Sequence, residues 1–248
     1  MPSILVSDLH VSYKKLEDTI PLIRNISFEL SEGDVLLVVG LNGAGKSTLI
    51  QTITGIIPNA LDSYVVKGDI FVGDTKIDKT YCPFTNGTIF ITQNPQNQFL
   101  GLSVYQELQS LLSHLKNPTD KSISEFAKEI HLDAQLNSSI FELSMGQKQM
   151  LVLSTLFLAH GNILLLDEPT SFLDKTMTEW LMNLVHKAKE RKATIIINTH
   201  TPRLFSTLAT NVLALQKGEV IFFKDISDVT NDDYLELYHI PDKTVKII

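Results

Sequence analysis

Residues 40–48 of the chain read Gly40-Leu41-Asn42-Gly43-Ala44-Gly45-Lys46-Ser47-Thr48, after the apolar run Val35–Val39 and before the helix-competent stretch Leu49–Thr54. An apolar run of this length is typical of a strand buried on both faces of a parallel sheet. The glycines let backbone N–H groups turn inward around a phosphate, where Lys46 can reach the β- and γ-phosphates and Ser47 can hold Mg²⁺. A glycine-rich turn with an exposed lysine is the plainer alternative, but the strand before and the helix after favour a nucleotide phosphate site.

Two carboxylates end the next buried strand. The apolar run Ile163–Leu166 is followed by Asp167-Glu168-Pro169-Thr170. The carboxyl ends of strands in an open α/β sheet border the ligand crevice, so both acids are expected beside the phosphate loop. Asp167 is then placed near Mg²⁺, and Glu168 is placed to orient or deprotonate an attacking water. A solvated turn or a helix N-cap is the alternative for the pair taken alone.

The region before residue 31 and the middle of the chain have different patterns. Apolar residues alternate over 4–11 and over 23–30, which predicts two half-buried strands in a small antiparallel patch, with Leu16–Pro21 as a polar connection. From Val104 to Ile140 apolar residues recur at helical spacing, which predicts a helical insert.

The second half predicts a βαβ unit. The apolar strands Ile163–Leu166 and Thr194–Ile197 flank the helical segment Thr176–Arg191. Shorter strand-like runs lie at Gly68–Val72 and Thr88–Thr92. Together these elements predict an α/β fold with a mixed or parallel sheet.

Composition narrows the function classes. The 248 residues carry a net charge of −7, so long-range electrostatics do not favour nucleic acid or anionic lipid. Cys82 is the one cysteine, which excludes an internal disulfide and the usual zinc pairs and suits a reducing compartment. No apolar run approaches the roughly 20 residues of a membrane span, and the start lacks the features of a secretory signal. We therefore expect a cytosolic chain.

Further motifs follow the phosphate loop in the order in which they occur in one protein family. With them, nearly the whole chain resembles the nucleotide-binding subunits of ATP-binding-cassette (ABC) proteins. Leu143-Ser144-Met145-Gly146-Gln147 resembles the family signature Leu-Ser-Gly-Gly-Gln, and Ser171-Phe172-Leu173-Asp174 resembles its D-loop. His200 resembles the switch histidine, Gln93 the loop glutamine, and Tyr13 the aromatic that stacks on adenine. The resemblance implies a P-loop nucleoside triphosphatase core and one nucleotide-binding domain over 1–248, with an α-helical subdomain at about 100–160 and a short C-terminal extension at about 224–248.

The resemblance also implies an ATPase that uses ATP and Mg²⁺. Its implied catalytic residues are Glu168, His200 and Gln93, and its implied metal-site residues are Ser47, Gln93 and Asp167. The residues expected to contact the nucleotide are Tyr13, Gly40, Asn42, Gly43, Ala44, Gly45, Lys46, Ser47 and Thr48. Taken alone, a histidine after a buried strand is more often a core or turn residue, and a loop glutamine is usually solvated. Tyr13 could equally be an edge-strand aromatic.

A second anion site is expected where the helix after Leu143 begins. In the family, residues at the positions of Ser144, Gly146 and Gln147 clamp the γ-phosphate held by a partner chain, and the D-loop residue corresponds to Asp174. Two chains, identical or different, would thus sandwich two ATP molecules. Met145 stands where the family has glycine, so the signature is expected to act on the phosphate less efficiently. A plain helix N-cap is the alternative for this segment.

Two segments resemble the energy-coupling-factor branch of the family. The amide-rich stretch Gln93–Phe99 with Leu102–Val104 is similar to its elongated glutamine loop, and Phe223–Pro241 to its short helix after the cassette. This branch imports vitamins or transition-metal ions, so the implied partners are a membrane coupling subunit and a substrate-binding membrane subunit. The chain would sit at the cytoplasmic face of the membrane, with Gln93–Val104 transmitting motion to the insert.

Other functions stay open at this point. The ATPase could serve another ABC importer or exporter, or act in the cytosol on nucleic acid or ribosomes. The second is disfavoured because neither basic extensions nor a second cassette is present in the chain. A GTPase or P-loop kinase would lack the signature segment. A catalytically inactive regulatory cassette is disfavoured because the residues expected for hydrolysis, Lys46, Glu168 and His200, are all present.

Overall fold

The computed structural model describes residues 3–15, 18–61, 63–78, 87–113, 122–158, 161–230 and 233. Its centre is a six-stranded sheet in the order β10-β9-β3-β8-β7-β6, parallel except for the β10–β9 pair. The strands are β3 (Val35–Val39), β6 (Thr88–Ile91), β7 (Ile163–Asp167), β8 (Thr194–Asn198), β9 (Asn211–Gln216) and β10 (Glu219–Asp225). Every residue of β3, β7 and β8 is buried, as their apolar runs predicted.

A second sheet is antiparallel, in the order β2-β1-β4-β5. Its strands are β1 (Ile4–Lys15), β2 (Asp18–Leu30), β4 (Tyr64–Val72) and β5 (Thr75–Lys76). The antiparallel patch is thus confirmed, but the predicted connection at Leu16–Pro21 is wrong from Asp18 on, because β2 already pairs there, with Lys14 opposite Thr19. The side chains of 18–20 are exposed, and backbone pairing in a hairpin requires no apolar side chain.

The two faces of the parallel sheet are covered differently. Leu36 and Val38 of β3 face an apolar cluster shared with the antiparallel sheet and with α1 (Lys46–Ile53), next to which lies the short α2 (Ile56–Asn59). The other residues of β3, which are Val35, Leu37 and Val39, belong to a second apolar cluster with α6 (Lys175–Glu190). This alternation follows from the period of two along a strand. The predicted βαβ unit β7-α6-β8 is confirmed.

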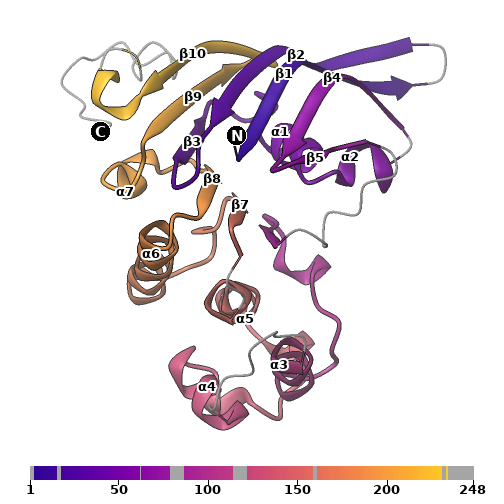
Figure 1. Cartoon of the computed structure of the whole chain (residues 1–248). Helices are drawn as coiled ribbons and strands as arrows, with labels where there is room; N and C mark the ends of the chain where they lie inside the picture. The colour runs from indigo at the N-terminus through magenta and orange to yellow at the C-terminus, as the bar shows by residue number, and fades with distance from the viewer. Residues whose placement is uncertain are drawn as a thin grey trace.

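The helices of the central insert form a separate apolar cluster. Figure 1 shows α3 (Val104–Ser113), α4 (Ile123–Glu129) and α5 (Met145–Leu158) together, on the side of the molecule away from the antiparallel sheet. Phe99 and Trp180 pack against both this cluster and the α6 side of the parallel sheet. The predicted helical insert is confirmed at α3 and α4, whereas residues 130–139 form turns and the short η2 (Asp133–Gln135).

Short elements complete the chain. They are the 3-10 helices η1 (Pro95–Asn97), η2 (Asp133–Gln135), η3 (Ile140–Glu142) and η4 (Ile226–Asp228), and the helix α7 (Pro202–Phe205). Within the described ranges, no helix combines the length and the apolar character needed to cross a membrane. The helix expected over Phe223–Pro241 is wrong at its start, because Phe223–Asp225 pair with β9 as the end of β10 and Ile226–Asp228 form η4. Cys82 and residues 231, 232 and 234–241 lie outside the described residues.

Candidate functional site

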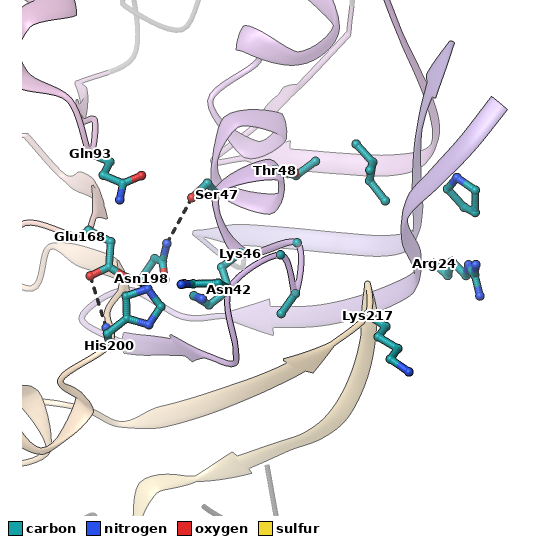
Figure 2. A pocket seen from close by; sticks show the side chains of 15 residues that line it. Arg24, Asn42, Lys46, Ser47, Thr48, Gln93, Glu168, Asn198, His200 and Lys217 are labelled. Atoms are coloured by element: carbon teal, nitrogen blue, oxygen red, sulfur yellow. Dashed lines mark hydrogen bonds and ion pairs between the residues drawn. The ribbon is translucent and has the colours of Figure 1, made fainter. Parts of the chain in front are cut away.

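A cavity of about 590 Å³ lies at the carboxyl edge of the parallel sheet (Figure 2). Its position follows from the fold, because β3, β7 and β8 run parallel and end at the same edge. The cavity is lined by Pro21, Leu22, Arg24, Asn42, Gly43, Ala44, Gly45, Lys46, Ser47, Thr48, Gln93, Glu168, Asn198, His200 and Lys217. The structure therefore brings the loop after β3 together with Glu168, Gln93 and His200.

The loop between β3 and α1 depends on glycine at two positions. Gly40 has φ +148°, and a Cβ there would collide with the carbonyl oxygen of Leu215. Gly45 has φ +101° and precedes the first residue of α1 without any side-chain cap. The backbone N–H groups at the start of α1 are thus not used by a capping side chain, which suits an anion.

Lys46 is the cation of the loop. Its side chain is buried, and its Nζ donates to the carbonyl oxygens of Gly40 at 2.8 Å and Leu41 at 3.1 Å. Burial lowers the pKa of Lys46, while the charges of Glu168 and Asp167 act in the opposite direction. The ammonium group is therefore held inside the loop that would surround a phosphate.

Ser47, Asp167 and Asn198 form one hydrogen-bond network. Ser47 Oγ donates to Asp167 Oδ1 at 3.0 Å. Asn198 Nδ2 donates to the same Asp167 Oδ1 and lies 3.4 Å from Ser47 Oγ. Burial raises the pKa of Asp167, against the hydrogen bonds from Asn198 and Ser47. Asn198, at the end of β8, thus joins Ser47 of α1 to Asp167 at the end of β7.

Glu168 lies beside His200 in the lining of the cavity (Figure 2). Glu168 Oε1 lies 3.1 Å from the ring atom His200 Nε2, close enough for an ion pair but without hydrogen-bond alignment. The backbone N–H of His200 donates to Glu168 Oε2 at 3.3 Å. Glu168 has φ +51°, an uncommon backbone conformation that a bond from its N–H to the Asn198 carbonyl supports. Burial raises the pKa of Glu168 to about 6, and burial with the Lys46 charge lowers the pKa of His200. At neutral pH this gives an ionised base beside a neutral imidazole.

The chemistry of the donors fits Mg²⁺. Ser47 Oγ and Asp167 Oδ1 are hard oxygen donors, and the buried Asn198 Oδ1 has no hydrogen-bond partner. Among the described residues, no group of three or more His, Cys, Asp or Glu side chains could hold a metal by itself. Phosphate and water oxygens would have to supply the remaining ligands, as is usual for Mg²⁺ at nucleotides.

Gln93 and Tyr13 are placed differently with respect to the cavity. Gln93 follows β6 and lines the cavity (Figure 2). Tyr13 lies on β1 opposite Ile20, and its ring packs edge-on against Tyr64 at 5.3 Å, outside the residues that line the cavity. Tyr13 therefore does not line the cavity, and its stacking on adenine stays a prediction.

The signature segment forms the start of α5, as predicted. The N–H of Gln147 donates to Ser144 Oγ at 3.2 Å, and the Ser144 N–H donates to Gln147 Oε1 at 2.9 Å. This reciprocal pair has the form of a capping box. Met145 Sδ accepts a hydrogen bond from Gln96 Nε2 at 3.3 Å, so the amide-rich loop touches the signature within the chain. Ser144, Gly146 and Gln147 do not line the phosphate cavity.

The D-loop packs behind the signature. A Cβ at Gly146 would lie 2.8 Å from the Phe172 carbonyl oxygen, so only glycine allows this approach of the two backbones. Asp174 caps α6, since its Oδ1 accepts from the Met177 N–H at 2.8 Å. In this chain Asp174 therefore has a structural partner of its own.

Sequence reasoning missed five residues that line the cavity. They are Pro21, Leu22, Arg24, Asn198 and Lys217. Four of them come from β2 and from the turn between β9 and β10, which only the tertiary fold brings to the loop. Asn198 carried a signal, because it is a polar residue at the end of an otherwise apolar strand.

The chain is similar to proteins that bind ATP in ABC transporters. The family model described as ABC transporter matches residues 23–171. The energy-coupling factor transporter ATP-binding protein EcfA1 of Fusobacterium nucleatum is 29% identical over 245 residues, which are 98% of this chain and 89% of that protein. A relative from Lactobacillus johnsonii, provisionally described as an ABC transporter ATP-binding protein, is 30% identical over 91% of this chain. The chain spans 40% of that relative's length and 47% of that of another from Treponema denticola.

Solved structures agree in fold. The cbiO1 protein of Clostridium perfringens, described as part of the ABC transporter complex cbiONQ, has a TM-score of 0.69 and 26% identity over 92% of this chain and 90% of that chain. The ATP-binding cassette MJ0796, in a dimeric post-hydrolysis state with ADP and Pi, has a TM-score of 0.74 over 90% of this chain and 98% of that chain. At 22% identity, MJ0796 supports the fold alone. Because the family model covers more than half of the residues, the chain belongs to the ABC transporter family, among its ATP-binding proteins.

Proposed function

We propose that this chain binds and hydrolyses ATP as the nucleotide-binding subunit of an ABC transporter of the energy-coupling-factor type. One observation carries the proposal: Lys46, Ser47 and Glu168 line one cavity at the ends of β3 and β7, and Asp167, just outside the lining, accepts a hydrogen bond from Ser47. The similarity to EcfA1 over 98% of the chain supports the branch, and vitamins or metal ions are the cargo class that the branch implies.

The residues of the chain divide the work of hydrolysis. Uncapped N–H groups at the start of α1 and the Lys46 ammonium bind the triphosphate. Ser47 and Asp167 would hold Mg²⁺, which neutralises charge on the phosphates when bound. Glu168 accepts a proton from the attacking water at neutral pH, because its pKa of about 6 leaves it ionised. His200 orients Glu168 and can donate to the γ-phosphate.

A second ABC ATPase subunit, identical to this chain or different, would complete the site. Ser144 Oγ accepts from Gln147 N–H, which leaves its own O–H free to donate to an anion. Because Ser144 and Gly146 lie outside the cavity of their own chain, they act on ATP held by the partner. ATP would then close the pair and hydrolysis would reopen it.

The membrane partner would contact an apolar surface next to α3. Leu100, Leu102 and Phe141 are 83%, 69% and 80% exposed, and Leu102 O accepts from the Ile140 N–H, next to Phe141. The N–H groups of Leu100 and Gly101 donate to the buried carboxylate of Glu107, which fixes this loop. Phe99, in the same loop, is not part of this surface, because it packs against two cores. Such preordered, exposed apolar side chains favour a protein partner, here the coupling subunit at the cytoplasmic face of the membrane.

Two measurements test the proposal. The purified chain should hydrolyse ATP in the presence of Mg²⁺, alone or with its partner subunit, and should hydrolyse none with EDTA. The double variant Leu102→Asp, Phe141→Asp should lose co-purification with the membrane subunits, whereas Ile221→Asp, at an equally apolar exposed position on β10, should retain it. Equal co-purification of both variants would exclude the docking surface and leave the ATPase proposal intact.

A further inference from the structure

Asn198 occupies the centre of the carboxyl edge of the parallel sheet. It is the last residue of β8, paired with Asp167 of β7 on one side and with Val38 of β3 on the other. The three residues before it, Ile195–Ile197, are apolar and fully buried, and they belong to the cores. A buried amide at the end of such a strand needs polar partners, because an unpaired one costs stability.

The donor side of this amide is fully used. Its Nδ2 donates to Asp167 Oδ1 and approaches Ser47 Oγ at 3.4 Å, so one NH₂ group contacts both residues that would hold Mg²⁺; Figure 2 shows the contact with Ser47. Ser47 belongs to α1 and Asp167 to β7, and Asn198 joins them from a third element. The mutual orientation of the two oxygen atoms therefore depends on Asn198.

The acceptor side of the amide is not used. Asn198 is 1% exposed, and its Oδ1 is buried without a hydrogen-bond partner, although the residue lines the cavity. A water with two or more polar neighbours would satisfy this oxygen. The neighbours at hand are the network of Ser47 and Asp167 and, when ATP is bound, its phosphates.

We propose that Asn198 is a positioning residue of the cation site: its Nδ2 orients Asp167 and Ser47, and its Oδ1 accepts a hydrogen bond from a water of hydrated Mg²⁺. The inference rests on the proposed ATP-binding function and adds to it an outer-shell residue. Outer-shell partners orient the direct ligands, and their loss typically lowers metal affinity about 10- to 100-fold.

Two substitutions should move the Mg²⁺ dependence of nucleotide binding in opposite directions. The readout is the ratio of the dissociation constant for ADP in EDTA to that in Mg²⁺, by calorimetry. Asn198→Leu removes donor and acceptor, and should lower the ratio by about 10-fold. Asn198→Asp keeps the shape and the acceptor but replaces the donor with a negative charge. The added charge should strengthen Mg²⁺ binding and weaken metal-free binding by more than the lost donor weakens Mg²⁺ binding, so the ratio rises several-fold.

A control separates this role from a structural one. Thr194→Val removes a buried hydrogen bond, to the Ser31 carbonyl, at the other end of the same strand. It should lower the unfolding temperature and leave the ratio unchanged. If Asn198→Asp, which preserves packing, also leaves the ratio unchanged, Asn198 has no role at the cation and the inference is overturned, whether or not Asn198→Leu folds. Failure of the wild-type chain to bind ADP at all would instead overturn the proposed function together with the inference.

Discussion

The starts of α1 and α5 are two helix N-termini in one chain, and they are prepared for anions in different ways. At α1 no side chain caps Gly45, and Lys46, Ser47 and Glu168 line the cavity, with Asp167 hydrogen-bonded to Ser47. At α5 Ser144 and Gln147 cap each other, and these residues lie outside the cavity. The first site is therefore nearly complete within one chain, whereas in the proposed pair of subunits the second would receive a phosphate brought by another chain.

The largest expected effect tests the α1 end. Glu168→Gln keeps the size of the side chain and removes the base, so ATP hydrolysis should fall by about 10²- to 10⁴-fold while ATP binding remains. A coupled phosphate-release assay and an equilibrium binding assay measure the two quantities. Glu179→Gln, on the exposed face of α6, is the matched control and should hydrolyse ATP at the wild-type rate. Equal rates for both variants would remove Glu168 from the mechanism.

Lys46→Met should be next in size. Loss of the ammonium group should reduce hydrolysis by about 10²- to 10³-fold and weaken ATP binding as well, because the charge acts on the phosphates in both states. The nucleotide-free protein should keep its stability, since burial of this charge is unfavourable. Unchanged ATP affinity in the variant would contradict the assignment of the loop. Lys175→Met, at an exposed position, provides the control.

Ser144→Ala tests the α5 end against a neighbouring cap of the same form. Ser139 caps η3 through the Phe141 N–H, with Glu142 reaching back, as Gln147 does at Ser144. Both Ser144→Ala and Ser139→Ala should cost about 1 kcal/mol of unfolding free energy. Only Ser144→Ala should also lower hydrolysis, by 10-fold or more on the scale of a lost transition-state donor. Equal hydrolysis by the two variants would reduce the signature to a helix cap.

The smallest effect is a pH dependence of stability at the cavity. The pKa of Glu168 rises from 4.5 to about 6 on folding, so the folded chain binds this proton more tightly than the unfolded chain. Stability from this group is therefore present below pH 4.5 and is lost as the pH rises through about 6, by about 2 kcal/mol in total. In nucleotide-free protein, Glu168→Gln should gain stability over the wild type at pH 8, and the gain should shrink toward pH 4.5 in urea unfolding.

Hydrolysis should show the opposite pH dependence. Glu168 must be ionised to accept a proton, so the rate should fall as the pH drops below about 6. Glu179→Gln should lose hydrolysis rate below about pH 6 as the wild type does, whereas the residual rate of Glu168→Gln should not depend on pH. Together these two results would assign the pH dependence of hydrolysis to Glu168. A pH-independent wild-type rate between pH 5 and 8 would contradict that assignment.

Much of the site was predictable because its residues follow one another along the chain. The apolar runs Val35–Val39 and Ile163–Leu166 fixed two strands, and the polar residues directly after each had to lie at a shared edge. The cap at Ser144 was predictable for the same local reason. The hairpin connection was predicted too long, because strand pairing at 18–20 depends on the backbone of β1 and not on apolar side chains.

The sequence by itself determined the phosphate loop, the carboxylates Asp167 and Glu168 at the end of β7, the signature helix and the α/β class, because each is a local pattern of residue types. Only the tertiary structure decided that Tyr13 packs on Tyr64, that Arg24 and Lys217 line the cavity, and that Asn198 joins Ser47 to Asp167. These contacts join residues far apart in the chain. Their partners are selected by strand order and register, and no single segment of the sequence contains that information.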